Sequence, residues 1–247
     1  MRKLGFVLAV SLAACGGGGA KYKVDDVALA NISLADKQPV FAAEHEVSIA
    51  KAEQAKAQAD QRDVDGQIDI ADKELEQAKL ETAKAKLTVD QAEKSHDMNR
   101  VASAQKDLRT AETGERAADA KTDWLSKLRK FHKQMQDVGE AHVQAAQSKV
   151  ELEKARLAAA KGIKPSADFK LDDYANDYAK RTKAWDEEKK DADQIKAQAD
   201  KLQQAYNNLQ SQYASLRAPQ QPPPTQPAPA QPQTADAPAP SQQAPAQ

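Results

Sequence analysis

The chain has 247 residues, with 36 basic and 37 acidic side chains and a formal net charge of −1. This balance excludes a strongly basic surface, so nucleic-acid binding has no electrostatic support. Aromatic residues make up 4% and charged residues 30% of the chain, which excludes an ordinary globular core and is typical of long helices or coiled coils. We therefore expect an all-α fold.

A short segment with positive charge and then apolar residues opens the chain. Arg2 and Lys3 precede an apolar run over residues 4–14. This run is too short to cross a membrane as a helix, which needs about 20 residues, but it suits the apolar region of a signal peptide. We predict a signal peptide over residues 1–14. Cys15 follows as the only cysteine, so no disulfide can form within the chain.

The motif Leu12-Ala13-Ala14-Cys15 resembles the lipobox of bacterial lipoprotein precursors. The resemblance implies that Cys15 becomes the mature N-terminus and carries diacylglycerol and an N-linked acyl chain such as palmitate; no other cofactor is expected. Two or more acyl chains anchor a protein stably to a bilayer. Gly16 stands where such lipoproteins have an aspartate for inner-membrane retention, which implies the periplasmic face of the outer membrane. Residues 15–38 are expected to form a flexible linker, beginning with four glycines after the cysteine.

A long helical segment is predicted over residues 39–161. Pro39 suits the first turn of a helix, and no other proline occurs before Lys161. In one interpretation the segment turns at Gly66 and Gly114, which gives a shorter helix from Pro39 and then two helices similar in length to the one expected over residues 167–217. In the other interpretation it continues unbroken, because a lone glycine costs a helix only about 1 kcal/mol.

One break interrupts the helical pattern near the C-terminal third of the chain. Gly162 can end a helix and Pro165 cannot continue it, so we predict a turn over residues 162–166. A coiled-coil helix over residues 167–217 should fold back along the preceding one. The expected fold is an elongated antiparallel helical hairpin or a three-helix coiled-coil bundle with a disordered C-terminal tail.

Apolar residues recur along these helices at alternating spacings of three and four, as they do in coiled coils. Folding the chain about the predicted turn brings Trp185 near residue 143 and Leu216 near residue 112. The aromatic residues in these series are more simply explained as bundle core than as a binding face. The candidate helix-packing seam consists of Trp124, Leu128, Phe131, Met135, Tyr178, Trp185, Ile195, Leu202, Tyr206 and Leu209.

The chain ends in a segment rich in proline, glutamine and alanine. Residues 218–247 contain ten of the 12 prolines. This composition offers little to bury, so it predicts a disordered tail with polyproline II character. Such a tail serves as a spacer or as a ligand for the aromatic groove of a partner, and we favour the spacer.

Residues 61–72, QRDVDGQIDIAD, resemble part of an EF-hand calcium loop. Calcium needs six to eight oxygen ligands. Gln61 replaces the first acidic ligand and Asp72 is shorter than the usual closing glutamate, so we expect no metal site and favour a solvated acidic turn. The residues that would bind calcium in this loop are Asp63, Asp65, Asp69 and Asp72.

The sequence contains no recognisable arrangement of catalytic residues. None of the four histidines lies four residues from another, and no serine lies in a nucleophile-elbow motif. His96 and His142 fall on the apolar seams, where a polar residue often sets helix register. We expect a protein that is not an enzyme.

Together these features predict an outer-membrane lipoprotein that acts as a structural or scaffolding coiled-coil rod in the cell envelope. Its expected partners are the membrane, through the lipid anchor, and a protein or peptidoglycan, with no nucleic acid and with self-association left open. The alternative is a periplasmic chaperone or assembly factor that holds client proteins between helical arms. The near-neutral charge and the small number of large apolar residues weigh against this alternative.

Overall fold

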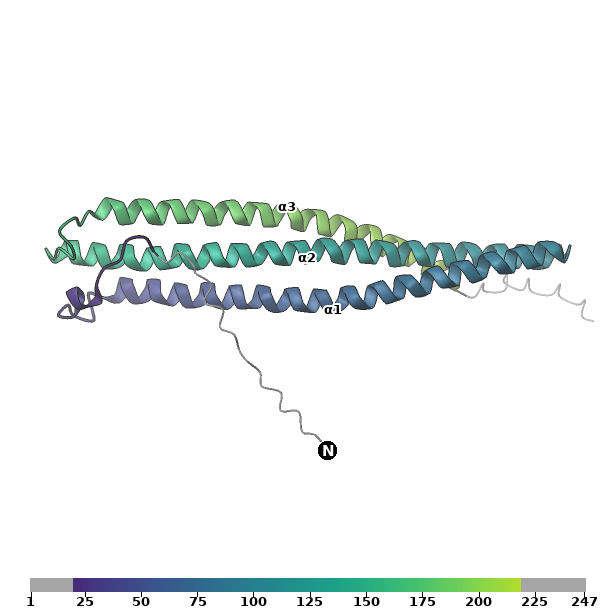
Figure 1. The fold of residues 1–247 in the computed structure, drawn as a ribbon, viewed down its shortest axis with the longest axis horizontal. Helices are drawn as coiled ribbons and strands as arrows, with labels where there is room; N and C mark the ends of the chain where they lie inside the picture. Colours follow the sequence, from purple (N-terminus) through teal and green to yellow (C-terminus); the bar gives the residue numbers. More distant parts are fainter. Residues whose placement is uncertain (1–19, 219–247) are drawn as a thin grey trace, which may run out of the picture.

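The computed structural model describes residues 20–218, and this part of the chain is helical and contains no β-strand. A short 3-10 helix, η1, spans Asp26–Leu29, and three long helices follow: α1 (Gln38–Lys94), α2 (Met98–Ala160) and α3 (Leu171–Arg217). Their 57, 63 and 47 residues correspond to lengths of about 85, 95 and 70 Å. Figure 1 shows an elongated rod with α2 between α1 and α3, which confirms the expected all-α architecture.

The corner between α1 and α2 lies at residues 95–97. The Ser95 hydroxyl donates a hydrogen bond to the Ala92 carbonyl at 2.6 Å, which closes the last turn of α1. His96 then adopts a left-handed backbone conformation with φ of 56°. The carboxylate of Asp97 accepts hydrogen bonds from the amides of Asn99 and Arg100, at 2.9 and 3.3 Å, and so caps the first turn of α2.

The interpretation with corners at Gly66 and Gly114 is wrong, because α1 continues through the first and α2 through the second. No atom from elsewhere in the chain lies within 4 Å of a Cβ built on Gly66, so this glycine is simply exposed on the helix. The cost of a lone glycine, about 1 kcal/mol, is smaller than the gain from the apolar seam that continues on both sides. His96 was also expected on a seam, but it is exposed in the corner.

The turn between α2 and α3 begins at Gly162, whose φ of 68° suits a residue without a side chain. The amides of Gly162 and Ile163 donate to the carbonyls of Ala159 and Ala158 at 3.1 and 2.9 Å, which satisfies the end of α2. The connection continues to Lys170, so α3 begins four residues later than residue 167. Ser166 does not cap α3; its carbonyl instead accepts from the Phe169 amide at 3.3 Å.

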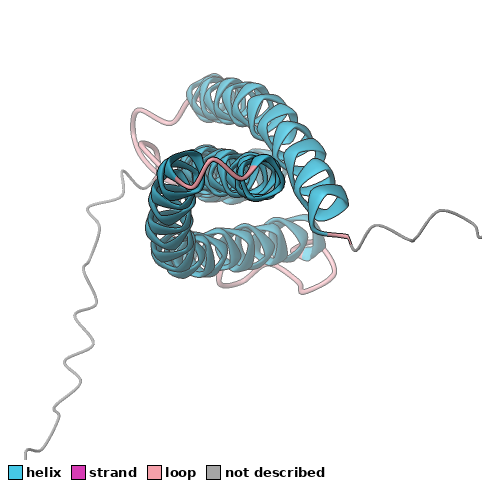
Figure 2. Ribbon diagram, turned by 90° about the vertical axis from the view of Figure 1, so that its right-hand side faces the viewer, coloured by secondary structure: helices cyan, strands magenta, loops and turns pink. Residues whose placement is uncertain are grey.

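Helices α1 and α3 both pack on α2 and not on each other: none of their Cα atoms lie within 8 Å of one another. Ala50, Ala71 and Ala92 of α1 are buried against α2, at spacings of three heptads. Such small side chains allow close approach of the helix axes. Figure 2, a view along the rod, shows that the helices coil around one another.

Neighbouring positions of α2 face different helices. Trp124 stacks on Tyr206 of α3, with ring centroids 5.8 Å apart. Gly139 lies two heptads and one residue further along α2. It faces α1, because a Cβ built on Gly139 would lie 2.9 Å from the Cα of Gln54. One residue corresponds to about 100° around a helix. α1 and α3 are therefore spread apart around α2 instead of closing a triangle, and a groove stays open between them.

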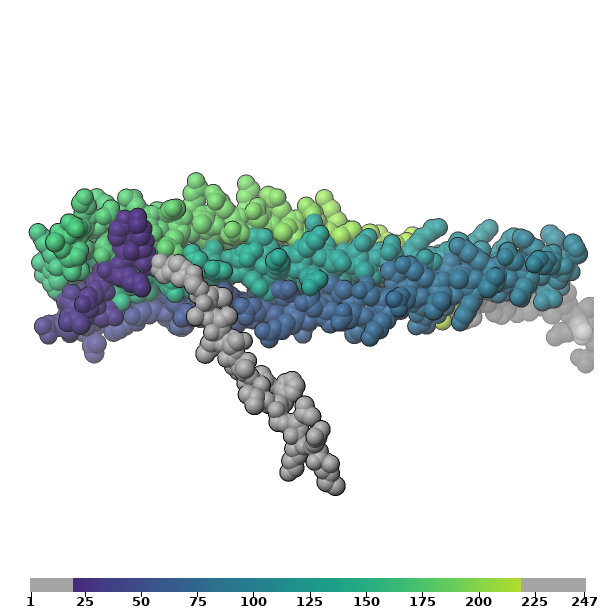
Figure 3. Space-filling view, in the orientation of Figure 1, coloured from purple at the N-terminus to yellow at the C-terminus, as the bar shows by residue number. Residues whose placement is uncertain are grey.

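The segment before α1 is packed on the rod, which corrects the expectation of a flexible linker for its described part, residues 20–37. Val24 and Leu29 are each 4% exposed and form a cluster with Leu152, Ala155 and Tyr174. Burial of these apolar side chains favours the docked position of the segment against α2 and α3. Figure 3 shows the segment, in purple, crossing one end of the rod.

Polar contacts fix the same segment. The Val24 amide donates to the Glu151 carboxylate at 2.7 Å, and Lys154 Nζ lies 2.6 Å from Asp26 Oδ1. Burial opposes the charge of Lys154, but the hydrogen bond to Asp26 and the charge of Glu151 outweigh it and raise the pKa of the lysine. The N-terminal segment is therefore held by both apolar burial and ion pairing. The predicted signal peptide, Cys15 and the proline-rich tail beyond residue 218 lie outside the described residues.

Candidate functional site

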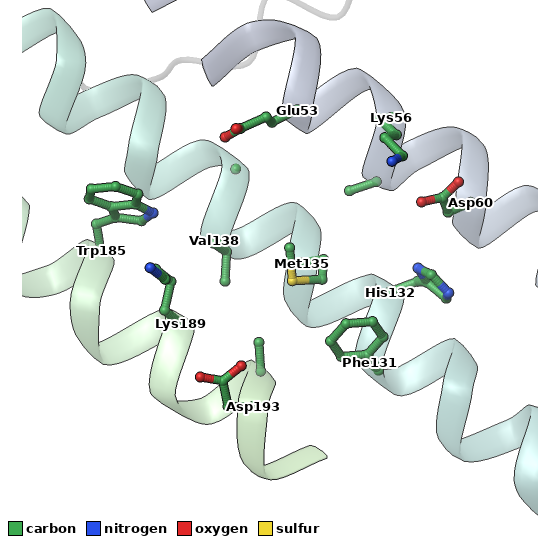
Figure 4. A pocket seen from close by; sticks show the side chains of 13 residues that line it. Glu53, Lys56, Asp60, Phe131, His132, Met135, Val138, Trp185, Lys189 and Asp193 are labelled. Carbon is green, nitrogen blue, oxygen red and sulfur yellow. The ribbon is translucent and has the colours of Figure 1, made fainter. Parts of the chain in front are cut away.

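An open groove of about 450 Å³ lies over α2, between α1 and α3. Phe131, Met135 and Val138 of α2 form its floor, and Trp185 of α3 forms part of one wall. Charged side chains of both signs line the rim, as Figure 4 shows. They are Glu53, Lys56 and Asp60 of α1, and Lys189 and Asp193 of α3. The groove therefore combines an apolar floor with a rim of mixed charge, which suits a neutral, mainly apolar ligand.

One histidine joins all three helices at an end of this groove. The imidazole of His142 stacks on the indole of Trp185, with ring centroids 4.1 Å apart and an interplanar angle of 3°. Its Nδ1 lies 2.9 Å from the Glu53 Oε2 of α1. Lys189 Nζ lies 5.2 Å from the centre of the Trp185 ring, within the range of a cation–π contact. His142 thus occupies a seam position, and its ring contacts both flanking helices.

Below this junction a polar network joins α2 to α3. The Ser148 hydroxyl donates to Asp177 Oδ2 at 3.1 Å, and the same oxygen accepts from Arg181 Nε at 3.1 Å. Arg181 also donates to the side-chain oxygen of Gln144 at 3.1 Å. Because every member is at least half-buried, the network fixes the register of α3 against α2.

A row of pairs at the surface fixes the register of α1 against α2. Glu46 pairs with Lys149 at 2.5 Å, Asp65 with Arg129 at 2.7 Å, and Glu74 with Lys121 at 2.5 Å. The hydrogen bond to Glu46, together with its charge, raises the pKa of Lys149 against the opposing effect of burial. Exposed pairs of this kind contribute only about 0–1 kcal/mol each, so they select the register more than they stabilise the fold.

The four calcium-ligand candidates lie on α1 and not in a loop. Asp63, Asp69 and Asp72 are exposed, and Asp65 is engaged by Arg129. Residues 20–218 contain no cluster of three or more side chains suited to hold a metal ion. The predicted acidic turn is wrong, because α1 continues without a break through residues 61–72. An uninterrupted helix cannot bend these carboxylates around one ion.

All ten residues of the candidate helix-packing seam are half-buried in the structure. Trp124 meets Tyr206, while Phe131, Met135 and Trp185 line the groove instead of a closed core. The heptad pattern of the sequence does not predict the groove. Its signal is a second series of small residues on α2, with Gly139 and Ala146 each one residue after a buried apolar residue, Val138 and Ala145.

Comparison with protein-family models, with curated proteins and with solved structures finds no match to this chain. The fold places it in the class of elongated all-α proteins built from long antiparallel helices. No helix among the described residues has the length and apolar character needed to span a bilayer.

Proposed function

We propose that the protein is a lipoprotein of the outer membrane whose helical rod serves as a scaffold in the periplasm. Its lipobox-like motif would place acyl chains on Cys15, five residues before the described part begins. The predicted tail beyond residue 218 would then reach a protein partner or peptidoglycan.

The observation that supports this proposal most is where the N-terminal segment joins the rod. Ala20 lines a shallow pocket together with Gln147 of α2 and Ser48 of α1, towards one end of the molecule. From Gln147 to the corner at Met98 is 49 residues of α2, or about 75 Å. An anchor just before Ala20 would hold one end near the bilayer and allow the other end to extend into the periplasm.

The anchor is tested by expressing the full chain in a Gram-negative host, separating the membranes and measuring the intact mass. We expect the mature chain to begin at an acylated Cys15 and to fractionate with the outer membrane. A Cys15→Ala variant should keep residues 1–14 and lose the acyl mass. A wild-type chain without acyl groups would contradict the anchor.

The scaffold role is tested by photo-crosslinking in intact cells, with crosslinkers near Trp185 and near Pro229 in the tail. Capture of one discrete protein, or of peptidoglycan, from the tail supports a scaffold or tether. Capture of many unfolded outer-membrane proteins from the rod would instead support a chaperone.

The groove is the observation that favours the chaperone as a second candidate. Its apolar floor of Phe131, Met135 and Val138 could contact an apolar client segment. Its volume of about 450 Å³ is, however, the size of a small-molecule site and gives little room for an unfolded polypeptide. A direct test is suppression of the aggregation of a denatured outer-membrane protein at equimolar ratio.

A further inference from the structure

The charged side chains on the rim of the groove lie at successive levels along the rod. Glu53 of α1 and Trp185 of α3 both contact His142, so these two residues share one level. Both helices run antiparallel to α2, and about one turn further along each of them is a lysine, Lys56 on α1 and Lys189 on α3. The two lysines therefore lie at one level, on opposite rims of the groove, as Figure 4 shows.

Two aspartates form the next level of the rim. Asp60 and Asp193 each follow the lysine of their own helix by four residues, or about 6 Å. Lysine before aspartate is the less favourable order for a pair within one helix. None of these four rim charges has a partner among the ion pairs identified in residues 20–218, although such pairs join α1 to α2 elsewhere along the rod. The rim thus presents a positive level beside a negative level.

Two adjacent levels of opposite charge are complementary to a second copy of the same groove. Two copies that face each other across a two-fold axis run either parallel or antiparallel. In the parallel pair each level meets itself, so lysines oppose lysines. In the antiparallel pair, with the axis between the two levels, Lys56 lies opposite Asp60 of the second copy. Lys189 lies opposite Asp193 in the same way, so the charges favour the antiparallel pair.

The same axis allows a long contact with an apolar centre. It lies about three residues from the middle of α3, so the α3 helices of the two copies overlap over about 40 residues, or about 60 Å. Specific interfaces bury about 800 Å² per partner, which a strip of about 60 Å reaches at a width of about 13 Å. Two adjacent helices, each about 10 Å wide, exceed this width. Phe131, Met135 and Val138 lie at the centre of the strip and the charges lie at its edges, as in other protein interfaces.

We propose that the groove between α1 and α3 is the interface of an antiparallel homodimer. In it the lysine level of each copy pairs with the aspartate level of the other, and the apolar floors face each other. This inference goes beyond the proposed scaffold and does not depend on lipidation of Cys15. From the axis, near Met135, to the corner at Met98 is 37 residues of α2, or about 55 Å. The two hairpin ends extend in opposite directions, so the dimer forms a rod of about 110 Å.

Self-association is measured by sedimentation equilibrium, which reports mass independently of the shape of the rod. The full chain carries Cys15→Ser, so that neither acyl chains nor a disulfide can link two copies. We expect a dimer of the 26.8 kDa chain. Lys56→Glu with Lys189→Glu makes both levels acidic and should raise the dissociation constant at least tenfold. The matched control, Lys51→Glu with Lys190→Glu, makes the same change in net charge at exposed positions outside the groove and should keep the dimer.

A complementary variant tests whether the two levels meet each other. Asp60→Lys with Asp193→Lys makes both levels basic, so this variant should also be monomeric when alone. Mixed with the acidic variant, it should form a one-to-one dimer at least tenfold tighter than either variant forms with itself. Restored pairing also shows that both variants are folded.

The relative direction of the two copies is measured as the distance between spin labels. The label is attached to Gln77→Cys in the Cys15→Ser chain, because Gln77 is exposed on α1. It lies 19 residues from the axis level at residue 58, so the antiparallel dimer separates the two labels by about 57 Å. A parallel dimer would hold them at one level, within the width of three helices, or about 35 Å.

Two results together support the proposal: a mixed dimer of the acidic and basic variants that is tighter than either alone, and a label distance close to 57 Å. A chain that stays monomeric at about 100 μM overturns the proposal. Reversal variants that dimerise as well as the control, or a mixture that does not pair, overturn the groove as the interface. A label distance below about 35 Å overturns the antiparallel arrangement. None of these results bears on the anchor, which the mass of Cys15 tests separately.

Discussion

His142 of α2 lies flat on Trp185 of α3, with ring centroids 4.1 Å apart, while its Nδ1 contacts Glu53 of α1. This contact ties together two helices whose Cα atoms do not come within 8 Å of each other. Both partners of His142, Trp185 and Glu53, also line the groove.

Replacing Trp185 by alanine removes the stack and part of the groove wall. Full truncation of a buried tryptophan costs about 3–5 kcal/mol, and Trp185 is half-buried, so we expect a loss of about 2 kcal/mol. Urea denaturation followed by circular dichroism measures it. Lys133→Ala, on the exposed face of α2, should change the free energy of unfolding by less than about 0.5 kcal/mol. Equal effects of the two variants would contradict the role of the stack.

The stack of His142 on Trp185 should contribute more to the stability of the fold than the contact between His142 and Glu53. The Glu53 side chain is 59% exposed, so Glu53→Gln should cost less than about 1 kcal/mol. His142→Ala loses buried aromatic area and should cost about 2 kcal/mol or more. Thermal melts of both variants at one pH make the comparison, and a larger effect of Glu53→Gln would show that the ion pair dominates.

Two glycines inside helices should respond oppositely to alanine. Gly66 faces open space, so Gly66→Ala should stabilise the protein by about 0.5–1 kcal/mol through helix propensity. At Gly139 the new Cβ would lie 2.9 Å from Gln54 Cα, so α1 must shift and Gly139→Ala should destabilise. Chemical denaturation measures both. Stabilisation by Gly139→Ala would mean that α1 packs less closely than the structure shows.

The two corners contain one residue each with a positive φ, and they differ in how well that residue fits. Gly162→Ala should destabilise the protein by about 1 kcal/mol, because the side chain of alanine is strained at a φ of 68°. His96→Gly should stabilise by a similar amount, because it relieves φ of 56°. Differential scanning calorimetry should show melting temperatures that shift in opposite directions. Shifts of the same sign would indicate a different conformation at one corner.

The N-terminal segment should loosen at alkaline pH. Its partners Lys154 and Tyr174 both have pKa values above their ordinary 10.5 and 10.0. For Tyr174, burial is the main cause, because it disfavours the phenolate. A group whose pKa is raised on folding stabilises below its unfolded pKa, and this contribution is lost as pH rises through the folded pKa. Stability should therefore fall above about pH 10.

Unfolding in urea between pH 8 and 11 checks this expectation. Lys154→Met removes the lysine contribution, so its stability should fall less steeply with pH than that of the wild type. Lys133→Met serves as a matched control, because Lys133 is exposed and has no ion pair among those identified in residues 20–218. Parallel pH profiles for Lys154→Met and the wild type would exclude Lys154 as a source of the slope.

The helical pattern of α3 and its pairing with α2 could be predicted because each follows from local rules. Heptad spacing defines the packed face, and folding at Gly162 predicts Trp185 near residue 143, where the structure has His142. The corner at residues 95–97 does not follow from the glycines, because capping residues form it. Asp97 and the left-handed His96 turn the chain there, whereas Gly66 stays inside a helix that its seam holds.

The groove could not be predicted in the same way. It depends on an offset of one residue between the two packed faces of α2, and small residues such as Gly139 and Ala146 mark the second face only weakly. The packing of residues 20–37 was missed for a related reason. A short apolar segment without periodicity, with Val24 and Leu29, shows its docking site only when α2 and α3 are already in place.

Because α1 and α3 contact α2 and not each other, the rod need not melt as one cooperative unit. Loss of α3 leaves the α1–α2 hairpin with its own alanine seam. Tyr213, in the last turns of α3, lies against Gly114 of α2, so the end of the hairpin between Gly114 and the corner at residues 95–97 already lacks α3. A partially unfolded species with α3 released then has a free energy below that of global unfolding. In that species Trp185 leaves the imidazole of His142, and the floor of the groove opens to water on one side.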